Sequence, residues 1–203
     1  MLRVGLTGGL ASGKSLIAKE LERLGCHLIE ADALGHEVLM PSGEAYSPVV
    51  EQFGKEILAP DGTINRQKLS AIVFNDPEKL KSVTSIVHPA VRKLSDAKTA
   101  ALALTDPTGI LIYEAAILVE TGGFRDFDKL IVASCPEELQ IERAMARDGA
   151  TRESVVARLG RQLPLDEKIR HADYVIDTSG SKERTIEQTR IVFERLKTIE
   201  RTS

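Results

Sequence analysis

The chain has 203 residues and a formal net charge of -3, with 42% hydrophobic and 28% charged residues. These values are typical of a folded globular protein and argue against extended disorder. Tryptophan is absent and aromatic residues make up 4%, so the chain has neither the charge nor the stacking residues expected of a protein whose main partner is nucleic acid.

No apolar run approaches the roughly 20 residues that a membrane helix needs, so we expect no membrane span. The two cysteines, Cys26 and Cys135, lie in unrelated segments and form no C-x-x-C pair. We therefore expect reduced, buried thiols in a cytoplasmic protein.

An apolar run over residues 2–6 predicts a buried parallel strand, and residues 8–15 then read GGLASGKS. This is the pattern G-x-x-x-x-G-K-[ST], in the strand-to-helix context that it requires. Glycines allow successive backbone N–H groups to point at a phosphate, and the following helix adds its positive end. Lys14 can reach the β- and γ-phosphates, and the Ser15 hydroxyl can bind Mg²⁺. The pattern predicts a nucleoside triphosphate site; the alternative is a glycine-rich turn with a solvated lysine.

Apolar residues at helical spacing predict a helix from Lys14 that ends at Gly25, a favoured residue after a helix C-terminus. Residues 27–29 predict a second strand, which runs into Asp32. A β-α-β unit with a phosphate loop in its first turn is therefore expected by residue 32.

The middle of the chain, residues 34–104, shows helical periods and breakers but no convincing strand. The motif Pro41-Ser42-Gly43 predicts the end of one helix, Pro60-Asp61-Gly62 a turn, and Asn75-Asp76-Pro77 a break between two helices. His88-Pro89 predicts the start of a long helix that ends near Leu104. A helical insertion of this size between strands of a nucleotide-binding sheet suggests a domain for the acceptor substrate.

Strand signals return at residues 110–113, 130–133 and 174–176. Between the last two lie a helix over 138–147 and a polar helical stretch over 149–171. Ser181 is a candidate N-cap for a terminal helix. The predicted fold is α/β, with a mostly parallel sheet.

Candidate chemical groups follow the predicted strands. Asp32 ends the second strand, where carboxylates can face the ligand crevice, accept a proton or hold a metal through water; the alternative is a helix cap. Glu114 follows the third strand and could be a second metal-linked carboxylate, and Glu120 is a weaker candidate. Arg143 and Arg147 share a helix face and could stabilise charge on a transferring phosphoryl group, or could simply be solvated.

Taken together, these motifs resemble the dephospho-CoA kinases. The resemblance begins with Gly5-Leu6-Thr7 and the phosphate loop, and continues through Ala31-Asp32, His88-Pro89 with Arg92, and Leu118-Val119-Glu120. Further matching segments (called matched islands below) lie later in the chain: Arg143 with Arg147-Asp148, Thr151-Arg152, Arg158 with Gln162, Ala172-Asp173-Tyr174-Val175-Ile176-Asp177, and Gly180. They cover nearly the whole chain in the order that the family has.

This resemblance implies ATP- and Mg²⁺-dependent phosphorylation of the ribose 3′-hydroxyl of dephospho-CoA. It implies a P-loop core over 1–33, 105–140 and 172–203, an acceptor domain over 34–104 and a lid over 141–171. Asp32 would be the base, Lys14 the phosphate-binding lysine and Arg143 the lid arginine, with the 178–180 turn beside the adenine. The residues expected to bind ATP are Gly8, Ala11, Ser12, Gly13, Lys14, Ser15, Leu16, Arg147, Ser179 and Gly180; those expected to bind the acceptor are Thr7, Asp32, His88, Arg92, Glu114 and Leu118.

Two positions depart from the family pattern. Glu30 stands where an aspartate is usual, and Glu114-Ala115-Ala116-Ile117-Leu118 replaces Asp-Ile-Pro-Leu-Leu, which removes a proline constraint. Two other functions stay open: a P-loop kinase for a nucleoside monophosphate or another small metabolite, and a nucleotide-dependent switch, which the lack of an N-K-x-D-like stretch disfavours. We expect a monomer or a weak homo-oligomer.

Overall fold

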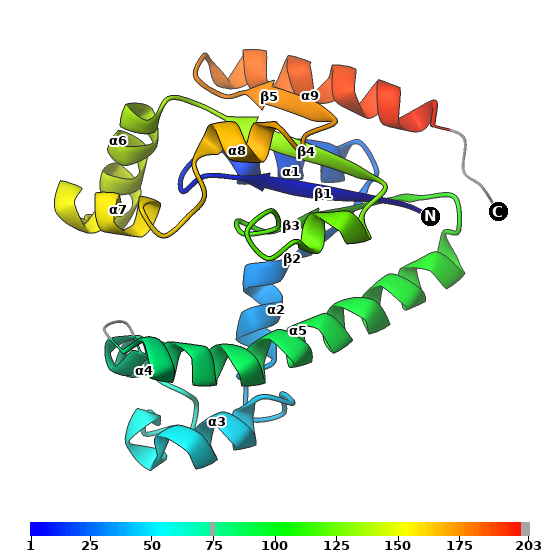
Figure 1. Ribbon diagram of the computed structural model, residues 1–203. Coiled ribbons are helices and arrows are strands. Elements are labelled where there is room, and N and C mark those ends of the chain that lie inside the picture. The colour runs from blue at the N-terminus through cyan, green and yellow to red at the C-terminus, as the bar shows by residue number, and fades with distance from the viewer. Residues whose placement is uncertain (74–75, 200–203) are drawn as a thin grey trace. The chain divides into compact units, whose positions relative to one another are not determined.

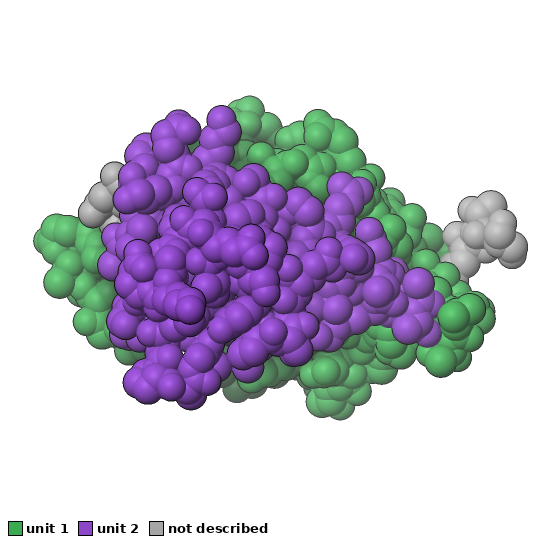
Figure 2. All heavy atoms as spheres, turned by 90° about the horizontal axis from the view of Figure 1, so that it is seen from below, with its two compact units in different colours: residues 1–29, 102–203 green, residues 30–101 purple. Residues whose placement is uncertain are grey.

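The computed structural model describes residues 1–73 and 76–199. The chain forms two compact units, residues 1–29 with 102–203 and residues 30–101 (Figures 1 and 2). The segment 141–171, which was expected as a lid, belongs to the first unit.

A five-stranded sheet in the order β2-β3-β1-β4-β5 organises the first unit (Figure 1). Its strands are β1 (Leu2–Gly8), β2 (His27–Glu30), β3 (Ile110–Glu114), β4 (Lys129–Ser134) and β5 (Tyr174–Asp177). The central strand β1 pairs in parallel with both β3 and β4, in a register that sets Leu6 opposite Glu114 and Gly8 opposite Ala133. The carboxyl ends of these strands therefore meet at one edge, where ligands bind in open α/β sheets.

Helices α1 (Lys14–Arg23) and α9 (Lys182–Lys197) cover one face of this sheet. Ile17 and Leu21 of α1, with Leu196 of α9, pack in one apolar cluster with the side chains that β1 and its neighbours direct to that face. On the opposite face, the side chains of Leu118 and Phe127 lie beside Gly5 of β1, and α8 (Leu165–Ile169) lies near β4. With both faces covered, β1 is buried over almost its whole length, which explains its continuous apolar sequence.

Local signals set the ends of these helices as predicted. Gly25, at φ +98°, follows the end of α1, and the Cys26 N–H donates to the Leu21 carbonyl, as in a Schellman motif. The Ser181 hydroxyl accepts the Arg184 N–H and caps α9. Both cysteines are free and buried, and burial raises the pKa of Cys26 to about 12.

The remaining helices of the first unit are α6 (Glu137–Asp148) and α7 (Arg152–Leu159), with the short 3-10 helix η2 (Gly123–Asp126). Thr151 caps α7 by accepting the Ser154 N–H at 3.3 Å. An apolar cluster joins Ile141 and Ala144 of α6 to Val155 of α7.

The second unit is helical, as the sequence predicted. It contains α2 (Ala31–Glu37), α3 (Tyr46–Phe53), the 3-10 helix η1 (Lys55–Ile57), α4 (Arg66–Val73) and most of α5 (Pro77–Thr105). Val49, Phe53, Ile57, Ile64 and Leu69 form its main core. Asn75 of the expected break lies outside the described residues, and α5 begins at Pro77, which suits the first turn of a helix.

The prediction that a helix starts at His88-Pro89 is wrong. Helix α5 runs continuously from Pro77 to Thr105 with Pro89 inside it, although proline cannot donate to the carbonyl one turn earlier. Ala90 and its apolar neighbours on both sides of Pro89 pack in a cluster with Val38 and Ala45. This tertiary packing offsets the local cost of the proline.

The expected position of Asp32 at the end of a strand also needs correction. Strand β2 ends at Glu30, and α2 begins at Ala31 with Glu30 as its N-cap. Asp32 is therefore an exposed residue in the first turn of a helix, in the second unit. A carboxylate there also interacts favourably with the helix dipole.

Within the described part of the chain, each helix is too short or too polar to cross a bilayer.

Glu20 provides a test of the packing of α1 on α9. Its buried carboxylate accepts bonds from Arg23 and from Arg190 of α9, both at 2.8 Å. Hydrogen bonds from these arginines lower the pKa of Glu20 to about 2. A carboxyl whose pKa is lowered by folding stabilises the protein above its unfolded pKa, and this contribution is lost as the pH falls through the folded pKa.

We therefore expect wild type to exceed Glu20→Gln in free energy of unfolding by a constant amount above about pH 5. The difference should shrink between about pH 4.5 and 2, as measured by urea unfolding at each pH. Arg190→Met should remove part of the same pH dependence. A difference that stays constant down to pH 2 would contradict this role of Glu20.

Candidate active site

The phosphate loop connects β1 to α1, and two glycines determine its path. A Cβ on Gly8 would lie 2.6 Å from the Ala133 carbonyl oxygen, so no larger residue fits beside β4. Gly13 has φ +86° and is the N-cap of α1. A Cβ on it would lie 3.2 Å from the Thr178 side chain. The loop therefore passes close to β4 and to the turn after β5. Gly8 is required by the lack of space, and Gly13 is favoured by its left-handed backbone.

Ala11 has φ +53°, a left-handed conformation that glycine adopts with less strain. Its methyl group and the Leu10 side chain pack against the cluster formed by Ile141, Ala144 and Val155. Leu10 and Ala11, the outer arm of the phosphate loop, are thus half-buried against the apolar core of the α6–α7 pair.

Lys14 is the first residue of α1, and its ammonium donates to the carbonyls of Gly8 and Gly9 at 3.2 and 2.9 Å. The side chain therefore lies along the loop, at the end of the helix where backbone N–H groups attract anions.

Ser15 and Glu114, two separate candidates for the metal side of the site, lie next to each other. The Ser15 hydroxyl donates to Glu114 Oε1 at 3.3 Å, and Glu114 is the last residue of β3. A hydroxyl and a carboxylate are hard oxygen ligands of the kind that Mg²⁺ prefers, with phosphate oxygens and water completing its shell. The residues present therefore fit a magnesium ion.

Thr178 joins the turn after β5 to the phosphate loop. Its buried hydroxyl donates to the carbonyl oxygens of Ser12 at 2.8 Å and Ser134 at 3.2 Å. Exposed Ser179 and Gly180 follow it, and the Ser179 N–H donates to Asp177 Oδ1. The bond from Thr178 to Ser12 therefore brings the predicted adenine-side turn to the predicted phosphate loop.

The two predicted arginines have different surroundings. Arg143 of α6 donates to the Thr178 carbonyl at 2.7 Å and to its hydroxyl at 3.4 Å, so it supports the turn beside the loop. Arg147, at the end of α6, pairs with Asp148, which also accepts a bond from Arg158 of α7 at 2.7 Å. These two arginines lower the pKa of Asp148.

Thr7 and Leu118, both expected to contact the acceptor, are buried at 0% and 6% exposure. The Thr7 hydroxyl donates to the Ala116 carbonyl, in the loop that follows β3. Leu118 lies beside Gly5 in the sheet core. Both side chains are packed inside the first unit, and their role as acceptor contacts stays a prediction.

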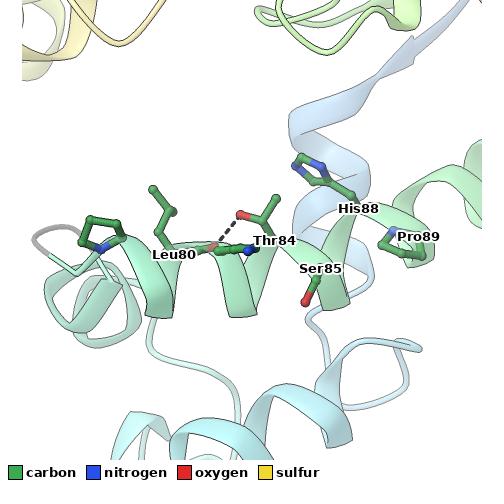
Figure 3. Close-up of a pocket in the computed structure, with 7 residues that line it drawn as sticks. Leu80, Thr84, Ser85, His88 and Pro89 are labelled. Atoms are coloured by element: carbon green, nitrogen blue, oxygen red, sulfur yellow. Dashed lines mark hydrogen bonds between the residues drawn. The ribbon is translucent and has the colours of Figure 1, made fainter.

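His88 and Arg92 lie on exposed faces of α5, one turn apart, in the second unit. A surface hollow along α5 is lined by Leu80, Thr84 and His88, with Pro77, Lys81, Ser85 and Pro89. Figure 3 shows Leu80, Thr84 and His88 on the same side of the helix, while Ser85 points the other way.

The sequence interpretation did not assign functions to three contacts at this site. These contacts join segments that are far apart in the chain. The Thr178 hydroxyl donates to the Ser12 carbonyl, and Gln162 accepts the Leu10 N–H at 2.9 Å. Fully buried Lys168 pairs with Glu120 at 2.6 Å. Gln162 lies within one of the matched islands, which was the one available signal for it.

A strand, a glycine-dependent loop and a helix that begins with Lys14-Ser15 define a P-loop protein. A carboxylate beside the Ser15 hydroxyl fits the metal side of such a site. Comparison with known proteins narrows this class. The Dephospho-CoA kinase family model matches residues 2–184, so the chain belongs to the dephospho-CoA kinase family, whose members are kinases that use ATP.

Curated relatives agree over nearly the full length. The Dephospho-CoA kinase of Aquifex aeolicus is 42% identical over 196 residues, covering 97% of this chain and 98% of the relative. That of Syntrophotalea carbinolica is 38% identical, covering 97% and 92%.

Solved structures agree as well. TT1252 from Thermus thermophilus has a TM-score of 0.82 at 30% identity, covering 96% of this chain and 97% of that one. The Dephospho-CoA kinase from Campylobacter jejuni has a TM-score of 0.65 at 26% identity, with 96% of each chain covered.

Ala11 gives a test of strain in the phosphate loop. A left-handed alanine costs about 1 kcal/mol relative to glycine. Ala11→Gly should therefore raise the melting temperature by about 2–4 °C, as measured by calorimetry. The matched control is Ala18→Gly. Ala18 lies inside α1 in a helical conformation, so this change should lower the melting temperature. Because Ala11→Gly also removes a methyl group that packs on the α6–α7 cluster, the contradicting result is a melting temperature lowered as much as in Ala18→Gly.

Proposed function

We propose that the protein transfers the γ-phosphoryl group of ATP to the ribose 3′-hydroxyl of dephospho-CoA, giving CoA and ADP. The observation that carries this proposal is the family match over residues 2–184, together with a phosphate loop of the geometry described above. We further propose that it works with Mg²⁺, in the cytoplasm, as a monomer or a weak homo-oligomer.

The triphosphate side of the proposal uses the phosphate loop. The N–H groups of Gly13, Lys14 and Ser15 bind phosphate oxygens, and the Leu16 N–H, which donates to the Gly13 carbonyl at 3.1 Å, is shared with them. The Lys14 ammonium has three protons, so it binds the β- and γ-phosphates in place of the Gly8 carbonyl while it keeps its bond to the Gly9 carbonyl. Ser15 and Glu114, which are hydrogen-bonded to each other, hold Mg²⁺ directly or through water. The ion, when bound, neutralises charge on the phosphates.

On the adenine side, Ser179 and Gly180 contact the base through an exposed turn that Thr178 fastens to the loop. Arg143 and Arg147 are the proposed arginines of the transferring phosphoryl group. Since Arg143 donates two bonds to Thr178, its contact with phosphate requires an exchange of partners. Until that exchange, Arg143 positions the adenine-side turn.

On the acceptor side, the second unit supplies the base. Asp32 accepts the proton of the 3′-hydroxyl as the oxygen attacks the γ-phosphorus, and the bond to the β–γ bridging oxygen breaks, leaving its electron pair on ADP. The exposure of Asp32 is compatible with this role. His88 and Arg92 are the proposed acceptor contacts on α5, and the hollow beside His88 supports the first of these. The second unit is accordingly the proposed acceptor domain and 141–171 the proposed lid.

The role of Asp32 predicts a change in turnover rather than in nucleotide binding. Asp32→Asn should lower kcat by about 100-fold or more, the usual contribution of a general base, and change the affinity for ATP less than about twofold. Single-turnover rates and calorimetric titration with ATP measure the two quantities. Glu37→Gln, which removes a carboxylate from the same helix, is the control and should leave kcat near wild type. Turnover of Asp32→Asn comparable to wild type would remove Asp32 as the base.

The acceptor itself can be tested directly. Purified protein with ATP and Mg²⁺ should add one phosphoryl group to dephospho-CoA, seen by mass spectrometry, and ADP release should be slow without an acceptor. A panel of nucleoside monophosphates and small alcohols is the comparison. Faster transfer to a nucleoside monophosphate than to dephospho-CoA would overturn the proposed acceptor and leave the P-loop kinase class intact.

A further inference from the structure

The peptide between Gly9 and Leu10 is hydrogen-bonded on both sides. Its carbonyl accepts the Lys14 ammonium at 2.9 Å and the Ser12 N–H at 3.2 Å. Its N–H, on Leu10, donates to Gln162 Oε1 at 2.9 Å. Because C=O and N–H belong to one rigid plane, the partner that fixes the N–H also fixes the direction of the carbonyl that holds Lys14.

Gln162 is itself placed by anchored neighbours. The N–H of the next residue, Leu163, donates to Glu120 Oε1 at 3.1 Å, and the same oxygen accepts the Lys168 ammonium at 2.6 Å. Lys168 is fully buried and also donates to the Ala116 carbonyl at 2.7 Å. A buried charge with these partners resists displacement, because leaving would strand it without them. Gln162 therefore extends from a fixed segment.

The same arm of the loop is packed as well as hydrogen-bonded. Leu10 and Ala11 contact the α6–α7 cluster, and Gln140 of α6, at 3% exposure, lies directly beneath Gly9, where a Cβ would meet its Oε1 at 2.1 Å. This packing limits the access of water to the Leu10–Gln162 bond, which is partly buried. A water molecule therefore replaces the glutamine oxygen less readily than it would on an open surface.

We propose that Gln162 is a positioning residue for ATP binding. It orients the Gly9–Leu10 peptide, and through the Gly9 carbonyl it sets the place from which the Lys14 ammonium reaches the phosphates. Without it the lysine samples more conformations, and ordering it costs more when ATP binds. The proposal rests on the ATP-binding part of the proposed function and does not depend on the acceptor.

A double-mutant cycle with Lys14 tests this route of action. Gln162→Met keeps the length of the side chain and removes its oxygen acceptor. Calorimetric titration with ATP and Mg²⁺ should show about fivefold weaker binding than wild type, as expected for one lost hydrogen bond. In the Lys14→Met background the same change should weaken binding less than about twofold, because the group that it positions is absent. The proposal would be overturned if Gln162→Met weakened ATP binding equally in both backgrounds, or if it left ATP binding unchanged in the protein that keeps Lys14.

Controls separate positioning from a general loss of structure. Thr151→Ala removes the cap of α7 in the same helical segment without touching the loop, and should lower the melting temperature while leaving ATP affinity within about twofold. If Thr151→Ala weakened ATP binding as much as Gln162→Met does, the specific role of Gln162 would be overturned. If Gln162→Met does not fold, Gln162→Asn, one methylene shorter, takes its place in the cycle. Unchanged ATP affinity in Lys14→Met alone would instead overturn the proposed role of Lys14.

Discussion

The structure depends on how tightly the chain curls between Gly8 and Gly13. At Gly8 the backbone passes so close to Ala133 that a side chain would collide with it, and at Gly13 the loop turns into α1 in a conformation that glycine favours. This curl leads to a single point, the N-terminus of α1. A polyanion is the natural partner of such a point, because helix N-termini carry unpaired donors and partial positive charge.

The rest of the first unit supports this curl from three directions. β1 lies between β3 and β4, so Glu114 ends beside the loop on one side. On the other side, Thr178 fastens the turn after β5 to Ser12. The third support comes from the α6–α7 cluster and from Gln162, in the loop between α7 and α8, which hold the outer arm at Leu10. Each supporting group contacts the loop backbone or a neighbouring side chain.

Local sequence was enough to predict much of this arrangement. The glycines and Lys14-Ser15 define a loop whose form follows from backbone conformation, and short apolar runs between breakers predicted the parallel strands. The place of Glu114 after the third predicted strand was found from sequence, and the meeting of parallel strand ends at one edge explains why it lies beside Ser15. Gly25 and Ser181 set helix ends through interactions that span only a few residues.

The errors and omissions arose where distant segments decide the outcome. Helix α5 continues through Pro89 because Val38 and Ala45 pack against it, which no window around the proline contains. Gln162 and Thr178 meet the loop across separations of 152 and 166 residues, and a lone glutamine or threonine gives no periodic signal. Arg143 was assigned to the phosphoryl group from its spacing to Arg147 and the family pattern, and neither signal predicts its bond to Thr178, 35 residues away.

Amide chemical shifts test the central claim most directly. When ¹⁵N-labelled protein is titrated with Mg²⁺ and a non-hydrolysable ATP analogue, the N–H resonances of Gly13, Lys14 and Ser15 should move downfield, as donors to phosphate do. The Leu10 N–H, already bonded to Gln162, should move much less. If the resonances of Gly13, Lys14 and Ser15 stayed in place at saturating nucleotide, these backbone groups would not be the phosphate site, and the account would be wrong.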